Sequence, residues 1–111
     1  MERIVVITGG SSGIGKAIAE RFAATGNIVY ELSRSGKSTP HIHHITCDLT
    51  DSAQIKEAFA ELARSVRRID ILINNAGMGV SGATECISEE EARQLMDVDF
   101  FAAWLCAKEA L

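Results

Sequence analysis

Short apolar runs alternate with amphipathic stretches along this chain of 111 residues. Four apolar runs, rich in β-branched residues, predict strands at 4–7, 27–32, 42–47 and 69–73. Apolar residues at helical spacing predict helices at 13–25, at 51–67 and from Ser88 to the C-terminus. Too few residues separate the second and third strands for a crossover helix, so a loop or a single helical turn is expected there. The pattern predicts one α/β domain over residues 1–111, built on a parallel sheet.

Composition and charge narrow the class of protein. A hydrophobic content of 47% fits a globular domain, and no uncharged run is long enough to span a bilayer. The net charge of −4 offers no electrostatic reason to expect nucleic acid or an anionic membrane as a partner. The first strand begins after three residues, so no signal peptide is expected. Without Cys-x-x-Cys spacing, Cys47, Cys86 and Cys106 are expected to be free thiols in a reducing cytoplasm.

A glycine-rich loop, Thr8-Gly-Gly-Ser-Ser-Gly-Ile-Gly15, joins the first strand to the first helix. A strand, a tight loop and a helix in this order present backbone N–H groups to a phosphate at the helix N-terminus. Gly9 would allow the turn, Gly13 the approach of a pyrophosphate and Gly15 the packing of helix on strand. An ordinary turn without a ligand is the alternative.

The polar loop after the second strand bears on the choice of nucleotide. Arg34 lies 19 residues beyond Gly15, where a dinucleotide-binding unit holds the adenosine ribose. An NAD site would place a carboxylate there, whereas this chain has Ser33 and Arg34, which suit a 2′-phosphate. Glu31 precedes the strand end and is expected to be a poor ribose ligand. The loop therefore favours NADP(H) over NAD(H).

Three histidines, His41, His43 and His44, lie close to Cys47. Their spacing matches no closed zinc pattern, so no metal site is expected, and a solvated loop and strand edge is the favoured interpretation.

The spacing of the first loop and the Asn-Asn-Ala-Gly tetrapeptide at 74–77 together resemble the short-chain dehydrogenase/reductase family. The resemblance implies a Rossmann-like, doubly wound sheet with strand order 3-2-1-4 and helices on both faces. It also implies that Asp48 contacts the adenine amino group and that the Leu49 N–H contacts a ring nitrogen. Asp51 and Gln54 would separately cap the next helix. The implied cofactor-binding residues are Gly9, Ser11, Ser12, Gly13, Ile14, Gly15, Ser33, Arg34, Asp48, Leu49, Asn75, Ala76 and Gly77.

The resemblance covers only the N-terminal part of a family member. Members interconvert an alcohol and a carbonyl by hydride transfer, using a serine and a Tyr-x-x-x-Lys that this chain lacks. Tyr30, its only tyrosine, is not followed by lysine four residues on. Asp99 stands where the family usually has an asparagine of the proton relay, and an ionised aspartate accepts hydrogen bonds but cannot donate them. The chain alone is therefore expected to bind cofactor at most and to be catalytically silent.

The last predicted helix has two apolar stripes. Leu95, Val98, Ala102, Leu105 and Cys106 form one, and Phe101, Trp104 and Leu111 form the other. One stripe can face the sheet, while the second implies another buried contact, and the resemblance places this helix in a subunit interface. A homodimer or larger oligomer is expected, and the apolar helix end without a cap suggests an interrupted chain.

Two other functions stay open. A nucleotide-binding or protein-interaction module would use the same fold without catalysis. Half of an S-adenosylmethionine-dependent methyltransferase would share the fold logic, but the first loop and the tetrapeptide fit it poorly.

Overall fold

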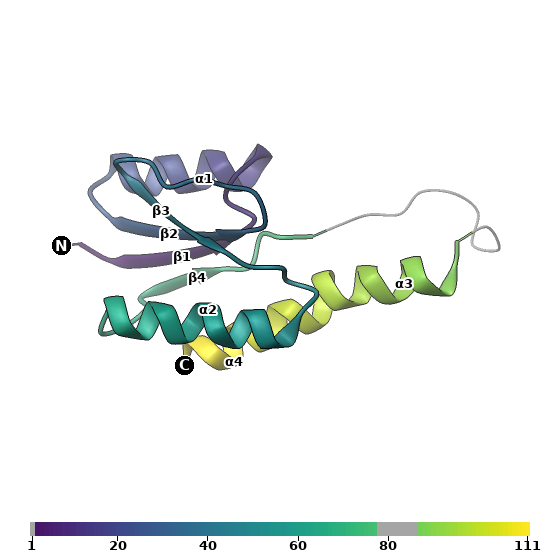
Figure 1. Cartoon of the computed structure of the whole chain (residues 1–111). Coiled ribbons are helices and arrows are strands. Elements are labelled where there is room, and N and C mark those ends of the chain that lie inside the picture. The colour runs from purple at the N-terminus through teal and green to yellow at the C-terminus, as the bar shows by residue number, and fades with distance from the viewer. Residues whose placement is uncertain (1, 78–86) are drawn as a thin grey trace.

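A computed structural model describes residues 2–77 and 87–111 and contains a four-stranded parallel sheet (Figure 1). The strands are β1 (Ile4–Thr8), β2 (Ile28–Ser33), β3 (Ile42–Thr46) and β4 (Ile71–Ile73). Their order is β3-β2-β1-β4, which confirms the predicted 3-2-1-4 order. β1 therefore lies inside the sheet and pairs on both sides, with Val5 opposite Val29 of β2 and opposite Ile71 of β4.

Helices cover both faces of the sheet, as predicted. The helix α1 (Gly13–Ala24) lies on one face, and α2 (Ser52–Ser65) and α4 (Ala103–Ala110) lie on the other (Figure 1). Between β2 and β3 the chain forms a loop with no helix, as the short spacing requires. In the described ranges 2–77 and 87–111, no helix combines the length and apolar character needed to cross a membrane.

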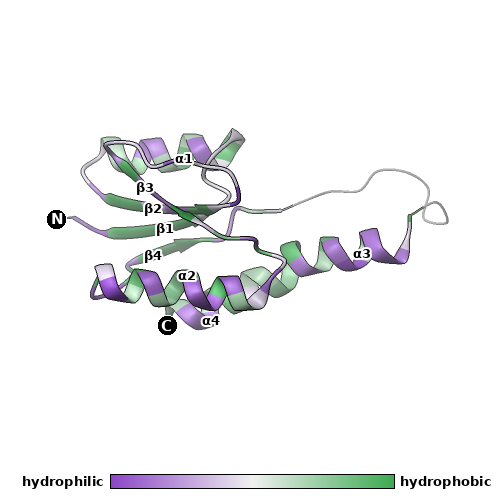
Figure 2. Ribbon diagram, in the orientation of Figure 1, coloured by the Kyte–Doolittle hydropathy of each residue, from purple (hydrophilic) through white to green (hydrophobic). Residues whose placement is uncertain are grey.

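Strand alternation divides the core into two clusters, one on each face. On the α1 face, Val5 and Ile7 pack with Ala19 of the helix. On the opposite face, Val6 and Leu32 pack against α2 and α4. Successive side chains of a strand point to opposite faces, so a strand covered on both sides must be apolar at nearly every position. The hydropathy colouring shows this in the strands (Figure 2).

The bounds of all four strands differ from the sequence prediction by one or two residues. β2, for example, begins and ends one residue later than expected and so includes Ser33. β4 begins at Ile71, not Ile69, and its three residues are only half-buried. The sequence predicts a fully buried strand here, but β4 is an edge strand and has a single neighbour, β1.

The C-terminal segment is not the single α-helix that its pattern predicts. The helix α3 (Glu89–Met96) continues through a π-helical segment, η2 (Asp97–Ala102), into α4. A π-helical turn takes up extra residues and so rotates the side chains that follow it. The two predicted stripes nevertheless differ in burial: Leu105 is 8% exposed, whereas Trp104 is 56% exposed.

Two thiols lie in the core between the sheet and α4. Cys47 follows β3, Cys106 belongs to α4, and both are fully buried in the same cluster. Burial raises the pKa of Cys47 to about 11, helped by the charge of Asp48, and raises the pKa of Cys106 to about 12. Both sulfurs are free thiols, and their low thiolate fraction makes them poor nucleophiles. The remaining cysteine, Cys86, lies outside the described residues.

We expect Cys47 and Cys106 to resist alkylation in the folded protein. At pH 8 a Cys86→Ser variant should react with iodoacetamide about 100-fold more slowly than the same variant in guanidinium, because burial removes both access and thiolate. Peptide mass spectrometry over time measures the two rates. Equal rates for either thiol with and without denaturant would contradict its placement in the core.

Candidate functional site

A cleft of about 700 Å³ opens at the carboxyl ends of β1, β2 and β4. This is the end of an open parallel sheet at which ligands bind in α/β proteins. The cleft is lined by every residue predicted to contact a cofactor except Gly13. Its lining also includes residues that the sequence did not single out: Leu32, Ser35, Cys47, Thr50, Gln94 and Val98. Gln94 and Val98 come from α3 and η2. The local sequence pattern of these segments does not predict that they lie at this edge of the sheet.

The glycine loop has the backbone that its sequence requires. Gly9 and Gly13 have φ values of 70° and 58°, in the left-handed region that favours glycine. The Gly9 N–H donates to the Leu32 carbonyl at 2.8 Å, which fixes the start of the loop against β2. A Cβ on Gly15 would overlap the Gly9 carbonyl and the Asn75 side-chain amide. Gly15 therefore allows the first turn of α1 to lie against the loop and Asn75, whereas the sequence assigned it to the packing of helix on strand.

The N-terminus of α1 differs from those of α2 and α3. Asp51 caps α2 by accepting from the Ala53 N–H, and Ser88 caps α3 by accepting from the Glu91 N–H. Ser12, at the N-cap of α1, makes no side-chain capping hydrogen bond, and the first turn of α1, like that of α2, carries no acidic residue. The first N–H groups of a helix need acceptors and carry its positive dipole end. A phosphate in the cleft beside Ser12 would satisfy both requirements.

The Asn-Asn-Ala-Gly tetrapeptide connects three parts of the fold. The Asn75 amide donates to the carbonyls of Thr8 and Gly9, each at 3.2 Å. The Ala76 N–H donates to the Thr8 hydroxyl at 3.0 Å, and the Asn74 amide reaches the Ala103 carbonyl at 3.3 Å. These contacts hold the end of β4 against the β1 turn and α4. Asn75 thus lines the cleft and also holds the backbone of the glycine loop in place.

Asp48 is an ionised acceptor at the far side of the cleft. Its Oδ1 accepts from the Thr50 hydroxyl at 2.7 Å and from the Thr50 N–H at 2.9 Å. These hydrogen bonds, together with the nearby Arg34 charge, hold the pKa of Asp48 below its ordinary value. The Asp48 N–H in turn donates to the Gln54 side chain at 2.8 Å. Gln54 therefore contacts Asp48, and the cap of α2 and the Asp48 turn form one unit.

Beside the cleft, in β2, lies a buried acid, Glu31, whose hydrogen bonds the sequence did not predict. Glu31 is 2% exposed, accepts from the Ser33 hydroxyl at 2.6 Å and lies 2.6 Å from Nδ1 of His44. The Ser33 hydrogen is therefore committed to Glu31, although the sequence assigned it to a 2′-phosphate. His44 and His43 alternate across β3, and His43 stacks on Tyr30. This alternation separates the two histidines that the sequence grouped as a candidate metal cluster.

Asp99 and Tyr30, the residues weighed for a proton relay, occupy different places. Asp99 belongs to η2 and approaches the end of the tetrapeptide, since a Cβ on Gly77 would lie 3.1 Å from its Oδ1. Tyr30 lies in β2, packs against the core on the α2 face and is absent from the cleft lining. The described residues therefore form a cleft at the carboxyl ends of the strands and bring no tyrosine to it.

Comparisons with known proteins agree with this geometry. A family model for short chain dehydrogenases matches residues 3–111. Over 110 residues the chain is 37% identical to the 3-ketodihydrosphingosine reductase of Bacteroides thetaiotaomicron, covering 98% of this chain and 41% of the relative. The chain thus spans less than half the length of that relative.

Solved structures with the same arrangement include complexes with either nicotinamide dinucleotide. A short chain dehydrogenase of Leptospira borgpetersenii with bound NAD⁺ superposes with a TM-score of 0.91 at 29% identity, over 99% of this chain and 45% of that one. The RhlG/NADP complex of Pseudomonas aeruginosa has a TM-score of 0.88 at 26% identity, over 97% and 46%. The cleft, the fold and the family model together show that this chain belongs to the short-chain dehydrogenase/reductase family.

Proposed function

We propose that this chain binds NADP(H) and forms the adenosine-and-pyrophosphate half of an oxidoreductase that interconverts an alcohol and a carbonyl. The observation that carries the proposal is the uncapped N-terminus of α1, which opens into the cleft beside Ser12. Gly9, Ser11, Gly13 and Ile14 would surround the pyrophosphate. A phosphate bound there would supply the acceptors that α1 lacks.

The adenosine would lie further along the same cleft. Asp48 would accept from the adenine amino group, and the Leu49 N–H would donate to the ring. The Asp48 carboxylate suits this role because its hydrogen bonds to Thr50 favour the ionised state and orient it. Asn75, Ala76 and Gly77 would line the ribose and pyrophosphate side, where small residues let the cofactor approach the backbone.

The preference for NADP(H) rests on the charges near the ribose. Arg34 is exposed at the end of β2 and lines the cleft, so its guanidinium is available to a 2′-phosphate. The nearest acid of that strand, Glu31, is buried, and both of its oxygens have partners. A 2′-hydroxyl would find no exposed carboxylate on this part of β2.

The chemistry of the reaction needs more than this half. When bound, the nicotinamide ring supplies the hydride chemistry, while the protein supplies position and a proton. The residues of this chain supply position. Asp99 replaces the usual relay asparagine, and Tyr30 packs into the core, so among residues 2–77 and 87–111 no tyrosine reaches the cleft. We propose that residues 1–111 alone bind the cofactor without turning over an alcohol or carbonyl.

NADP⁺ should stabilise the folded chain more than NAD⁺ does. At a concentration about 100 times Kd, a ligand that binds only the folded state adds about 2.7 kcal/mol, which raises Tm by about 10 °C in a domain of this size. Differential scanning fluorimetry with each nucleotide measures the two shifts. Absence of a shift with both nucleotides would overturn the proposed function, and an equal shift would overturn the preference alone.

Replacing Arg34 should weaken NADP⁺ binding selectively. An Arg34→Gln variant is expected to lose about 10- to 100-fold in NADP⁺ affinity, because a charge-assisted hydrogen bond to the 2′-phosphate is lost. NAD⁺ affinity should change less than twofold. Isothermal titration calorimetry measures both, with Arg67→Gln, an exposed arginine beyond α2, as the matched control. A parallel loss for both nucleotides would mean that Arg34 does not contact the 2′-phosphate.

The last helical segment supports self-association. Phe101 and Trp104 are 52% and 56% exposed, and Phe100 packs edge-to-face on Phe101, which leaves aromatic surface in water. Exposed apolar patches of this kind mark interaction surfaces. We propose that a second copy of the chain covers this face and forms a homodimer or a larger oligomer.

We therefore expect a dimer or larger species at micromolar concentration. Replacing Phe101 and Trp104 together with serine should shift the species towards monomer, because the apolar area buried between copies is lost. Light scattering after size-exclusion chromatography measures the mass, and Glu90→Ser on α3 serves as a surface control. A monomeric parent chain would contradict the proposal.

A further inference from the structure

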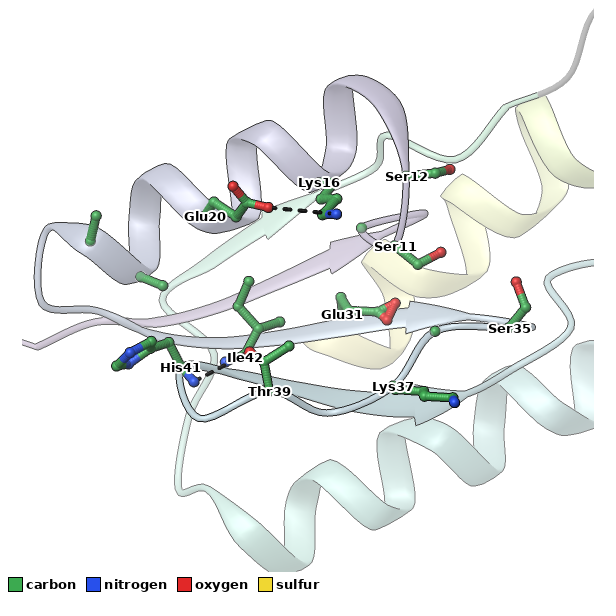
Figure 3. Close-up of a pocket in the computed structure, with 14 residues that line it drawn as sticks. Ser11, Ser12, Lys16, Glu20, Glu31, Ser35, Lys37, Thr39, His41 and Ile42 are labelled. Atoms are coloured by element: carbon green, nitrogen blue, oxygen red, sulfur yellow. Dashed lines mark hydrogen bonds and ion pairs between the residues drawn. The ribbon is translucent and has the colours of Figure 1, made fainter.

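A second, larger cavity lies behind the ribose end of the cleft, between α1 and the loop that follows β2 (Figure 3). We refer to it as the side cavity; its volume is about 860 Å³. Ser11, Ser12 and Ser35 line both the side cavity and the cleft, so the two spaces meet along these three residues. A group attached to the 2′ position of a ribose in the cleft would therefore face the side cavity.

The charges around the side cavity are mixed. Lys16 and Glu20 of α1 lie 4.0 Å apart and offset one another. Lys37 lines the opposite side and has no ion-pair partner among residues 2–77 and 87–111. Glu31 lies between Lys16 and Lys37 in the close-up view (Figure 3). Glu31 is the charged residue that β2 contributes to this lining, and its carboxylate would repel a 2′-phosphate.

Two side chains hold the Glu31 carboxylate. His44 lies with Nδ1 at 2.6 Å from Oε2, and its Nε2 lies 2.9 Å from the Thr46 hydroxyl. Nδ1 faces the carboxylate, and the Thr46 contact on Nε2 fixes the orientation of the ring. Ser33 donates to Oε1 at 2.6 Å. Only 9% of the His44 side chain and 3% of the Glu31 side chain are exposed.

Glycines close the space around this group. A Cβ on Gly36 would lie 2.7 Å from Glu31 Oε2 and 2.8 Å from His44 Nδ1. A Cβ on Gly10 would lie 2.6 Å from the Glu31 Cβ. The Gly36 N–H also donates to the Ser33 hydroxyl at 3.2 Å. The loop that carries Arg34 is thus held against the same hydrogen-bonded group.

We propose that His44 sets the nucleotide preference by masking the Glu31 carboxylate beside the position of the ribose 2′-phosphate. His44 is a positioning residue in this role, because it acts on the nucleotide through Glu31. The inference rests on the proposed function. The loop sequence attributes the preference between NADP(H) and NAD(H) to Ser33 and Arg34 alone. The inference adds His44, a strand residue outside the cleft lining, to the residues that determine this preference.

The physical basis is the repulsion between a carboxylate and a phosphate dianion. With His44 and Ser33 in place, the Glu31 carboxylate is held by two short hydrogen bonds in the wall of the side cavity, which partly offset its negative charge there. Without the imidazole, Oε2 loses its contact with His44 Nδ1, and its negative charge acts more strongly on a group in the side cavity. The resulting repulsion weakens binding of a 2′-phosphate by about tenfold and leaves a 2′-hydroxyl unaffected or better bound.

The central experiment compares the affinities for NADP⁺ and NAD⁺ in single and double variants of the full chain. In His44→Leu the ratio of NADP⁺ to NAD⁺ affinity should fall about tenfold, measured by isothermal titration calorimetry. Adding Glu31→Gln to His44→Leu should restore the ratio, because no charge remains to be masked. His43→Leu is the matched control: it changes the neighbouring histidine, which stacks on Tyr30 on the other face.

If His44→Leu fails to fold, Glu31→Gln alone serves as a second test. It removes the carboxylate charge, so it does not create a buried charge that lacks a partner. Its NADP⁺ affinity should stay within about twofold of the parent, since the charge it removes is already masked. An unchanged ratio in folded His44→Leu, or a tenfold gain in Glu31→Gln, would overturn the inference while the proposed function stands. A parent chain that binds neither nucleotide would overturn the proposed function, and the inference with it.

Discussion

The cleft depends on the hydrogen bonds from the Asn75 amide to the carbonyls of Thr8 and Gly9. A carbonyl at the end of a central strand loses its ladder partner where the chain turns, and it needs a donor when buried. Asn75 supplies that donor from a neighbouring strand, at a point where the absence of a Cβ on Gly15 leaves room for it. The glycine loop and the tetrapeptide are therefore one structural unit, although 66 residues separate Gly9 from Asn75.

The sequence predicts features that depend on local patterns better than features that depend on contacts between segments far apart in the chain. Apolar periodicity predicts the parallel sheet, and the family resemblance carried by two motifs implies the strand order, the two-sided covering of the sheet and most of the cleft lining. The π-helical segment and the arrival of Gln94 and Val98 at the cleft do not, because they depend on how a distant helix packs. The half-burial of β4 follows from sheet order, which single-strand composition does not report.

The pairing of Glu31 with His44 shows a different limit. Each residue is polar and lies in a largely apolar strand, and each looks unfavourable when taken alone, although Ser33 and Thr46 on the same face supply hydrogen bonds to them. Parallel register places them opposite one another, since β2 pairs with β3 at this position. A buried charge is tolerated when a partner and further hydrogen bonds satisfy it. The Glu31–His44 pair can therefore be predicted only when the register between β2 and β3 is known.

The order of strands also bears on how the site assembles. Val29 pairs with Ile42 and Ile4 with Ile28, whereas Val5 pairs with Ile71 across a much longer stretch of chain. Loop closure disfavours distant pairings, so contacts between sequence neighbours form earlier on average. The part of the cleft between β1, β2 and β3 therefore depends on pairings between segments that are close in sequence, whereas the part that contains Asn75, Ala76 and Gly77 also needs β4 to pair with β1. The cleft is complete only when this longest-range pairing has formed.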